Sequence, residues 1–176
     1  MTKQLLLMRH AKSDWPAEIR SDHDRPLNGR GRKTATRMGR WIQEQDLLPD
    51  LVLCSSARRT QETVERMLET WSTQPPVFPT AAIYLAAASN ILNVVRSDGM
   101  ESNRLLLVGH NPGMADLVGN LCGESNGFPT AALAIVEFAI DSWADLLPGS
   151  EANCRGIVRP KSLFNEDEVD KDGASR

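Results

Sequence analysis

The 176-residue sequence lacks the long apolar segments that membrane and secreted proteins carry. No stretch approaches the run of about 18 apolar residues that a membrane-spanning helix requires. The apolar segment that ends near Leu7 is too short for a secretory signal peptide. We therefore expect a cytoplasmic protein with no membrane partner.

The chain also lacks an excess of positive charge. It has 20 lysines and arginines against 23 aspartates and glutamates, which gives a formal net charge of −3. Nucleic-acid-binding domains usually present a basic field. We therefore expect no nucleic-acid partner, and a local cluster of arginines stands out against this background.

Cysteine pairs with the spacing of a zinc or redox site are absent as well. Cys54, Cys122 and Cys154 are odd in number, lie far apart and form no C-x-x-C motif. This usage favours three reduced, mostly buried thiols in a reducing compartment.

Short apolar runs alternate with longer amphipathic segments along the chain. The runs predict strands at 4–8, 51–54, 77–84, 105–108 and 133–140. The amphipathic segments predict helices at 28–45, from Ser55 or Ser56 (either could cap it), at 87–95 and after Gly113. Strands separated by helices indicate an α/β fold, a three-layer α/β/α sandwich with a mostly parallel central sheet.

The length of the chain fits one compact domain with a sizeable core. Residues 165–176 are acidic and nearly free of apolar side chains, which is typical of a solvated tail. We expect a single domain over residues 1–164 followed by a disordered acidic tail at 165–176. No long apolar surface stripe demands a dimer, and the oligomeric state is left open.

Two of the three histidines follow similar apolar runs. His10 follows the run at 4–8, and His110 follows the run at 105–108. In an open α/β sheet, ligands bind beyond the carboxyl ends of the strands. If the run at 51–54 is parallel to these two, it delivers Arg58 and Arg59 to the same edge.

Histidines and arginines at one edge suit a phosphoryl group. A neutral imidazole is a competent nucleophile toward phosphorus, and guanidinium groups match the phosphoryl oxygens in pairs. A helix starting near Asn111 would add backbone N–H groups. Either histidine alone is more often structural, and the two arginines could be an exposed basic pair, although the helix dipole disfavours cations at that end.

Three short segments resemble the motifs of the histidine phosphatase superfamily, in the same order. Arg9-His10-Ala11 resembles its Arg-His-Gly signature, with alanine in place of glycine. Residues 55–63 resemble the second motif, in an alignment that selects Arg59 rather than Arg58 to bind phosphate. Residues 109–113 resemble the third motif, and residues 9–13 and 25–28 are similar to the SixA-type phosphohistidine phosphatases.

The resemblance implies a phosphoglycerate mutase-like fold and a set of site residues. It implies that His10 is phosphorylated and that Arg9, Arg59 and His110 surround the phosphoryl oxygens. Further substrate contacts are expected from Ser13 and Asn111. The resemblance implies no metal and no organic cofactor.

A carboxylate is missing where larger superfamily members place a general acid, in residues 83–90. An alkoxide leaving group needs a proton, whereas a protonated phosphoimidazole leaves as neutral imidazole. The sequence therefore favours phosphohistidine on a protein partner as the substrate. A small-molecule phosphomonoesterase and a non-catalytic phosphate-binding module are the alternatives, and Asp14, Glu18 or Asp22 could still supply an acid.

Overall fold

A six-stranded sheet forms the centre of the protein. The computed structural model describes residues 1–124 and 126–164. The strands are β1 (Lys3–Arg9), β2 (Leu51–Ser55), β3 (Val77–Thr80), β4 (Arg104–Gly109), β5 (Leu133–Phe138) and β6 (Asn153–Val158). Their order across the sheet is β3-β2-β4-β1-β5-β6, so the strands that precede the two conspicuous histidines are neighbours.

The register of β1 and β4 explains why these histidines meet. The two strands run parallel, and Arg9 pairs with Gly109 at their ends. His10 and His110 are the next residues along each strand, so they lie side by side at the carboxyl edge of the sheet. β2 and β3 are parallel to β4, whereas β5 is antiparallel to its neighbours β1 and β6. The predicted mostly parallel sheet is confirmed.

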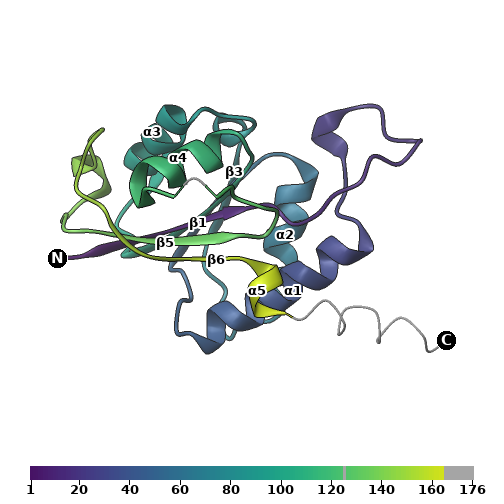
Figure 1. Ribbon diagram of the computed structural model, residues 1–176, viewed down its shortest axis with the longest axis horizontal. Helices are drawn as coiled ribbons and strands as arrows, with labels where there is room; N and C mark the ends of the chain where they lie inside the picture. The colour runs from purple at the N-terminus through teal and green to yellow at the C-terminus, as the bar shows by residue number, and fades with distance from the viewer. Residues whose placement is uncertain (125, 165–176) are drawn as a thin grey trace.

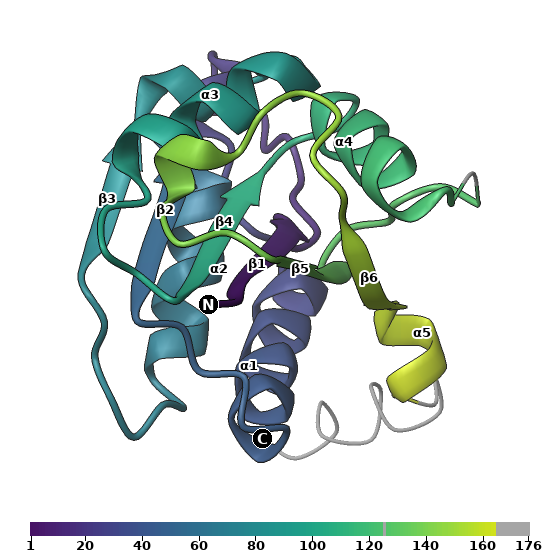
Figure 2. The same cartoon turned by 90° about the vertical axis from the view of Figure 1, so that its left-hand side faces the viewer.

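Helices cover both faces of the sheet, as Figures 1 and 2 show. The helices are α1 (Gly29–Glu44), α2 (Arg58–Leu68), α3 (Ala88–Asp98), α4 (Gly113–Cys122) and the short α5 (Pro160–Leu163). Three 3₁₀ turns, η1 (Asp22–Asp24), η2 (Ala81–Ile83) and η3 (Trp143–Asp145), lie between them. α1 and α2 pack on one face and α3 and α4 on the other, which confirms the three-layer α/β/α sandwich.

Strand β1 is fixed by the hydrophobic clusters on both faces. Leu5 and Leu7 belong to the cluster beneath α3 and α4, and Leu6 and Met8 belong to the cluster beneath α1 and α2. All four side chains are fully buried, and each such burial stabilises the fold by about 1.5–3 kcal/mol. The backbone that ends at His10 is therefore held from two sides.

Most of the helix and strand predictions are confirmed, but two elements lie outside them. β6 and α5 were not predicted, because β6 is a half-exposed edge strand that contains Gly156 and a charged Arg155 and so gives little apolar signal. The strand predicted at 77–84 ends at Thr80, where η2 begins.

The start of α2 also differs from the prediction. The helix begins at Arg58, and its N-cap residue Ala57 makes no side-chain capping bond. The expectation that Ser55 or Ser56 caps this helix is wrong. The two hydroxyls bind histidine side chains instead, those of His110 and His23 respectively.

Two of the three cysteines form a disulfide, contrary to the prediction of three reduced thiols. Cys122 at the end of α4 and Cys154 in β6 are bonded, with Cα atoms 5.2 Å apart. The packing of α4 beside β6 brings the two residues together across 32 positions of sequence, which spacing alone does not reveal. Cys54 is free and buried, and burial raises its pKa to about 12.

No helix in the described part of the chain is long and apolar enough to cross a membrane. The acidic tail predicted at 165–176 lies outside the described residues. The boundary between that tail and a domain at 1–164 therefore stays a prediction.

Candidate active site

The structure brings His10 and His110 together in one buried pocket. Their ring centroids are 5.2 Å apart, and only 7% of His10 and 2% of His110 is exposed. Both rings are therefore largely shielded from water and contact a few fixed polar groups. Those groups determine the protonation state of the two histidines.

His10 presents an unprotonated nitrogen to this pocket. Its Nδ1–H donates to the carbonyl oxygen of Ala11 at 2.7 Å. Because a carbonyl only accepts, Nδ1 carries the proton and Nε2 carries the lone pair. Nε2 accepts a hydrogen bond from Nε of Arg59 at 3.3 Å. Burial lowers the pKa of His10 to about 4, and the nearby guanidinium charges act in the same direction.

His110 is fixed in the opposite tautomer. Its Nδ1 accepts from Nη2 of Arg59 at 3.2 Å, because a guanidinium can only donate. Its Nε2–H then donates to Oγ of Ser55 at 2.8 Å. Burial, followed by the neighbouring His10 and Arg59, lowers the pKa of His110 to about 3.

We expect both pocket histidines to stay neutral in mildly acidic solution. At pH ~5.5 a histidine with the ordinary pKa of ~6.5 is about nine-tenths protonated, whereas His10 at about 4 and His110 at about 3 remain neutral. Imidazole NMR measures this directly, since the chain has 3 histidines, and His10→Asn and His110→Asn assign the signals. Imidazolium shifts for either residue at that pH would contradict the geometry.

Arg59 links the two rings from the first turn of α2. It is 3% exposed, and its donors reach both histidines. The neighbouring Arg58 is half exposed and pairs with Glu62 at 2.8 Å. The geometry thus places Arg59, and not Arg58, in the pocket. A buried cation at a helix N-terminus opposes the helix dipole, so an anion must compensate it.

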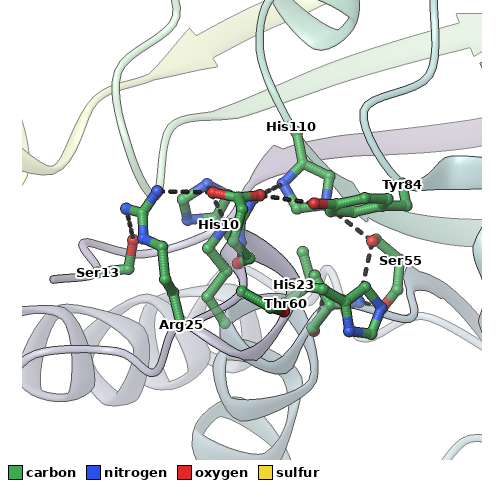
Figure 3. A network of polar contacts seen from close by, with 12 residues as sticks. His10, Ser13, His23, Arg25, Ser55, Thr60, Tyr84 and His110 are labelled. Carbon is green, nitrogen blue, oxygen red and sulfur yellow. Dashed lines mark hydrogen bonds and ion pairs between the residues drawn. The ribbon is translucent and has the colours of Figure 1, made fainter. Parts of the chain in front are cut away.

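The compensating anion is Asp22, from η1 in the segment between β1 and α1. Its Oδ2 accepts from Nη2 of Arg59 at 3.0 Å and from the hydroxyl of Tyr84 at 2.7 Å. Its Oδ1 accepts from Nη1 of Arg25 at 2.9 Å, and its backbone oxygen from Nη1 of Arg59 at 2.6 Å. Figure 3 shows this network, with Arg25 at one end and Tyr84 at the other.

These donors keep Asp22 ionised. Partial burial raises the pKa of the carboxyl, but the hydrogen bonds from Tyr84, Arg59 and Arg25 outweigh burial and lower it to about 2. The same contact raises the pKa of Tyr84, because its hydroxyl proton is held by a carboxylate. Asp22 is therefore a fixed negative charge at neutral pH.

Arg9 and Asn111 meet at the backbone of Phe128. Arg9 Nη1 and Asn111 Nδ2 donate to the carbonyl oxygen of Phe128 at 3.2 and 2.9 Å. Arg9 Nε and Asn111 Oδ1 are buried without a hydrogen-bond partner among the described residues. Burial lowers the pKa of Arg9, and the charge of Arg59 lowers it further. Both side chains thus retain unused capacity to bind a polar ligand.

The hydroxyl of Ser13 binds a neighbouring arginine in this structure. Its Oγ accepts from Nη2 of Arg25 at 2.7 Å, and Arg25 in turn binds Asp22. In this structure Ser13 therefore acts on the pocket through Arg25. Its contact with substrate stays a prediction.

The other acidic candidates of this loop lie apart from the histidines. Asp14 is exposed and binds the amide of Asn28 at 3.0 Å, and Glu18 is exposed. Only Asp22 contacts Arg59 among the three carboxylates that the sequence left open as acids.

Three residues of the network were not singled out as site residues from the sequence. Arg25 stood in a loop that was noted only for its resemblance, Ser55 was expected to cap a helix, and Tyr84 stood in the segment without a carboxylate. Tyr84 is the only tyrosine of the chain, which was the one available signal for it. The third histidine, His23, binds Ser56 at 2.9 Å and packs against Tyr84.

The pocket carries excess positive charge and no metal-binding cluster. Three guanidinium groups, those of Arg9, Arg25 and Arg59, face one carboxylate, which leaves two positive charges in excess while the histidines are neutral. Among the described residues, no group of three or more histidine, cysteine, aspartate or glutamate side chains could hold a metal ion. The arrangement suits an anion of two charges, such as a phosphoryl group.

The sequence is similar to a known protein family and to individual proteins. Residues 5–80 match the model of the histidine phosphatase superfamily (branch 1). An uncharacterized protein of Mycobacterium tuberculosis is 33% identical over 156 residues, which are 82% of this chain and 95% of that protein. An uncharacterized chloroplastic protein of Arabidopsis thaliana is 27% identical over 92% of this chain and 80% of its own.

Solved structures agree on the fold. A protein assigned as the phosphohistidine phosphatase SixA of Agrobacterium tumefaciens is 25% identical, with a TM-score of 0.76 over 90% of this chain and 98% of its own. One from Nakamurella multipartitia is also 25% identical, with a TM-score of 0.78 over 91% of this chain and 97% of its own. The chain belongs to the histidine phosphatase superfamily, in its SixA-type branch.

Proposed function

We propose that the protein hydrolyses phosphohistidine on a protein partner through a covalent intermediate on His10. Family membership supports phosphatase activity, and the likeness to a protein assigned as the phosphohistidine phosphatase SixA supports this substrate class. The observation that carries the proposal is the unprotonated Nε2 of His10, buried beside Arg59 and His110 in a pocket with excess positive charge.

The reaction has two displacements at phosphorus. In the first, Nε2 of His10 uses its lone pair to form a P–N bond while the P–N bond of the substrate breaks and its electron pair leaves with the substrate imidazole. In the second, water attacks phospho-His10, the P–Nε2 bond breaks, and inorganic phosphate departs with the proton balance completed by solvent. No metal or organic cofactor takes part.

The remaining pocket residues stabilise the charge on the phosphoryl oxygens. Arg59 and Arg9 supply guanidinium donors, and His110 supplies an imidazole beside them. Ser13 and Asn111 are proposed as further substrate contacts, Asn111 through its backbone N–H and Ser13 through its hydroxyl, which binds Arg25 in this structure.

The proposed leaving group is supported by the charge state of the carboxylate nearest to the two histidines among the described residues. Asp22 is the carboxylate that contacts the pocket arginine, and its pKa of about 2 leaves it without a proton to donate. An alkoxide leaving group would need that proton. A phosphoimidazole that is already protonated on its distal nitrogen leaves as neutral imidazole without it.

Turnover of matched substrates tests this proposal. We expect kcat/KM for a phosphohistidine protein to exceed that for a sugar phosphate by at least about 100-fold, since general acid catalysis contributes about 10²–10⁴-fold to reactions that need it. A preference for sugar phosphates would instead establish a small-molecule phosphomonoesterase. Binding of phosphorylated protein without any turnover would establish a non-catalytic module.

A further inference from the structure

Asp22 lies on the solvent side of the arginine that holds both histidines. Its side chain is 31% exposed, whereas Arg59 is 3% exposed. Ser55 and His110, which contact each other beyond Arg59, are 0% and 2% exposed. Asp22 is therefore the only one of these four side chains with substantial exposure to solvent.

This difference in exposure bears on the side from which a leaving group departs. A phosphoryl group bound to His10 is attacked in line, so its leaving group points away from Nε2. Among the side chains that contact Arg59, Asp22 is the most exposed, at 31% against 7% for His10 and 2% for His110. We therefore infer that the departing group leaves on the side of Asp22.

The contacts of Asp22 hold that carboxylate in place while leaving room for one more donor. Arg59 and Tyr84 bind Oδ2, and Arg25 binds Oδ1. A carboxylate oxygen has about two lone-pair sites, so Oδ1 can accept another hydrogen bond. The exposed third of the side chain makes such a donor accessible from solvent.

We propose that Asp22 determines leaving-group specificity by accepting a hydrogen bond from the distal N–H of a protonated phosphoimidazole. The inference rests on the proposed phosphohistidine phosphatase activity. The bond from Nε2 of His10 to phosphorus forms, the substrate P–N bond breaks, and its electron pair stays on the imidazole nitrogen. The distal N–H is retained, so the product is neutral imidazole and no proton leaves the enzyme.

The same carboxylate works against ester substrates. An alkoxide that forms beside Asp22 carries a negative charge next to that of the carboxylate, and such a pair is unfavourable. Asp22 thus favours a leaving group that carries an N–H and disfavours one that becomes anionic.

Asp22→Asn tests this role with two small substrates, phosphoimidazole and 4-nitrophenyl phosphate, across pH ~5.5–8.5. A neighbouring carboxylate raises the pKa of a bound cation by about 1–3 units. For phosphoimidazole, we expect the alkaline limb of kcat to move down by at least about one pH unit in the variant. Turnover should then fall about tenfold near pH 8 and change little near pH 5.5. For the aryl phosphate no limb should move.

Two further variants separate this role from a structural one. Asp24→Asn removes a charge from the same 3₁₀ turn, where Asp24 is exposed and binds Ser21, and should leave both profiles in place. Asp22→Glu keeps the charge and should restore the alkaline limb at least in part. A carboxylate that only braced Arg59 would predict an equal loss for both substrates at every pH, and that result would overturn the inference.

Failure of the inference is distinguishable from failure of the proposed function. If the unmodified enzyme turns over the aryl phosphate but not phosphoimidazole, the proposed substrate class is wrong whatever Asp22→Asn does. If the unmodified enzyme prefers phosphoimidazole and Asp22→Asn keeps both the preference and the alkaline limb, the function stands and the role of Asp22 is wrong.

Discussion

Replacing His10 with alanine is expected to lower kcat for every phosphorylated substrate by at least about 10⁴-fold, because the variant has no atom to form the phosphoenzyme. Nε2 of His10 is unprotonated and faces Arg59. Water attacking the substrate directly would have to replace a nucleophile that is already in position, and the remaining guanidinium groups supply only electrostatic stabilisation.

The control for this variant is the third histidine. His23 binds Ser56 and lies outside the pair of pocket rings, so His23→Ala should lose far less activity. The His10 variant should fold, since it gives up two buried hydrogen bonds, with Ala11 and Arg59, each worth about 1 kcal/mol. Thermal unfolding checks this point. Activity near that of the unmodified enzyme in folded His10→Ala would overturn the covalent mechanism.

Arg59→Lys is expected to lower kcat/KM by about 10²–10³-fold while conserving the charge. The guanidinium of Arg59 spans His10, His110 and Asp22 with separate donors in one plane. A lysine ammonium is a compact point charge on a flexible stem, and it cannot meet these three groups in the same geometry. Steady-state kinetics with an aryl phosphate measures the loss.

Arg58→Lys is a matched control in the adjacent position. Arg58 is half exposed, and its ion pair with Glu62 lies on the surface of α2, where such pairs contribute about 0–1 kcal/mol. We expect this variant to retain its activity. An equal loss in both variants, or a larger loss for Arg58→Lys, would show that the wrong arginine has been placed in the pocket.

The sequence predicted those parts of the fold and site that depend on local patterns. The apolar runs before His10 and His110 identify buried parallel strands, because both faces of such strands are covered. The matching position of the two histidines after these runs then follows the β1–β4 register. Arg59 was placed by the motif resemblance, and its burial separates it from Arg58.

The remaining parts depend on contacts between segments that are distant in sequence. Asp22 and Tyr84 are 62 positions apart, and their hydrogen bond arises only when η1 and the end of η2 meet at the pocket. The pairing of Cys122 with Cys154 likewise depends on tertiary packing. The prediction for Ser55 was wrong because a serine before a helix usually caps it, whereas here its hydroxyl binds the buried imidazole of His110.

Direct detection of the phosphoenzyme tests the central claim most directly. The enzyme is mixed with phosphohistidine protein, quenched in alkali within the first turnovers, digested, and analysed by mass spectrometry for phosphorylated peptides. The mechanism predicts one phosphoryl group, on the peptide that contains His10, which disappears when the substrate is exhausted and is absent from His10→Ala. Turnover without any phosphoenzyme, or a phosphoryl group on another residue that clears at the catalytic rate, would contradict it.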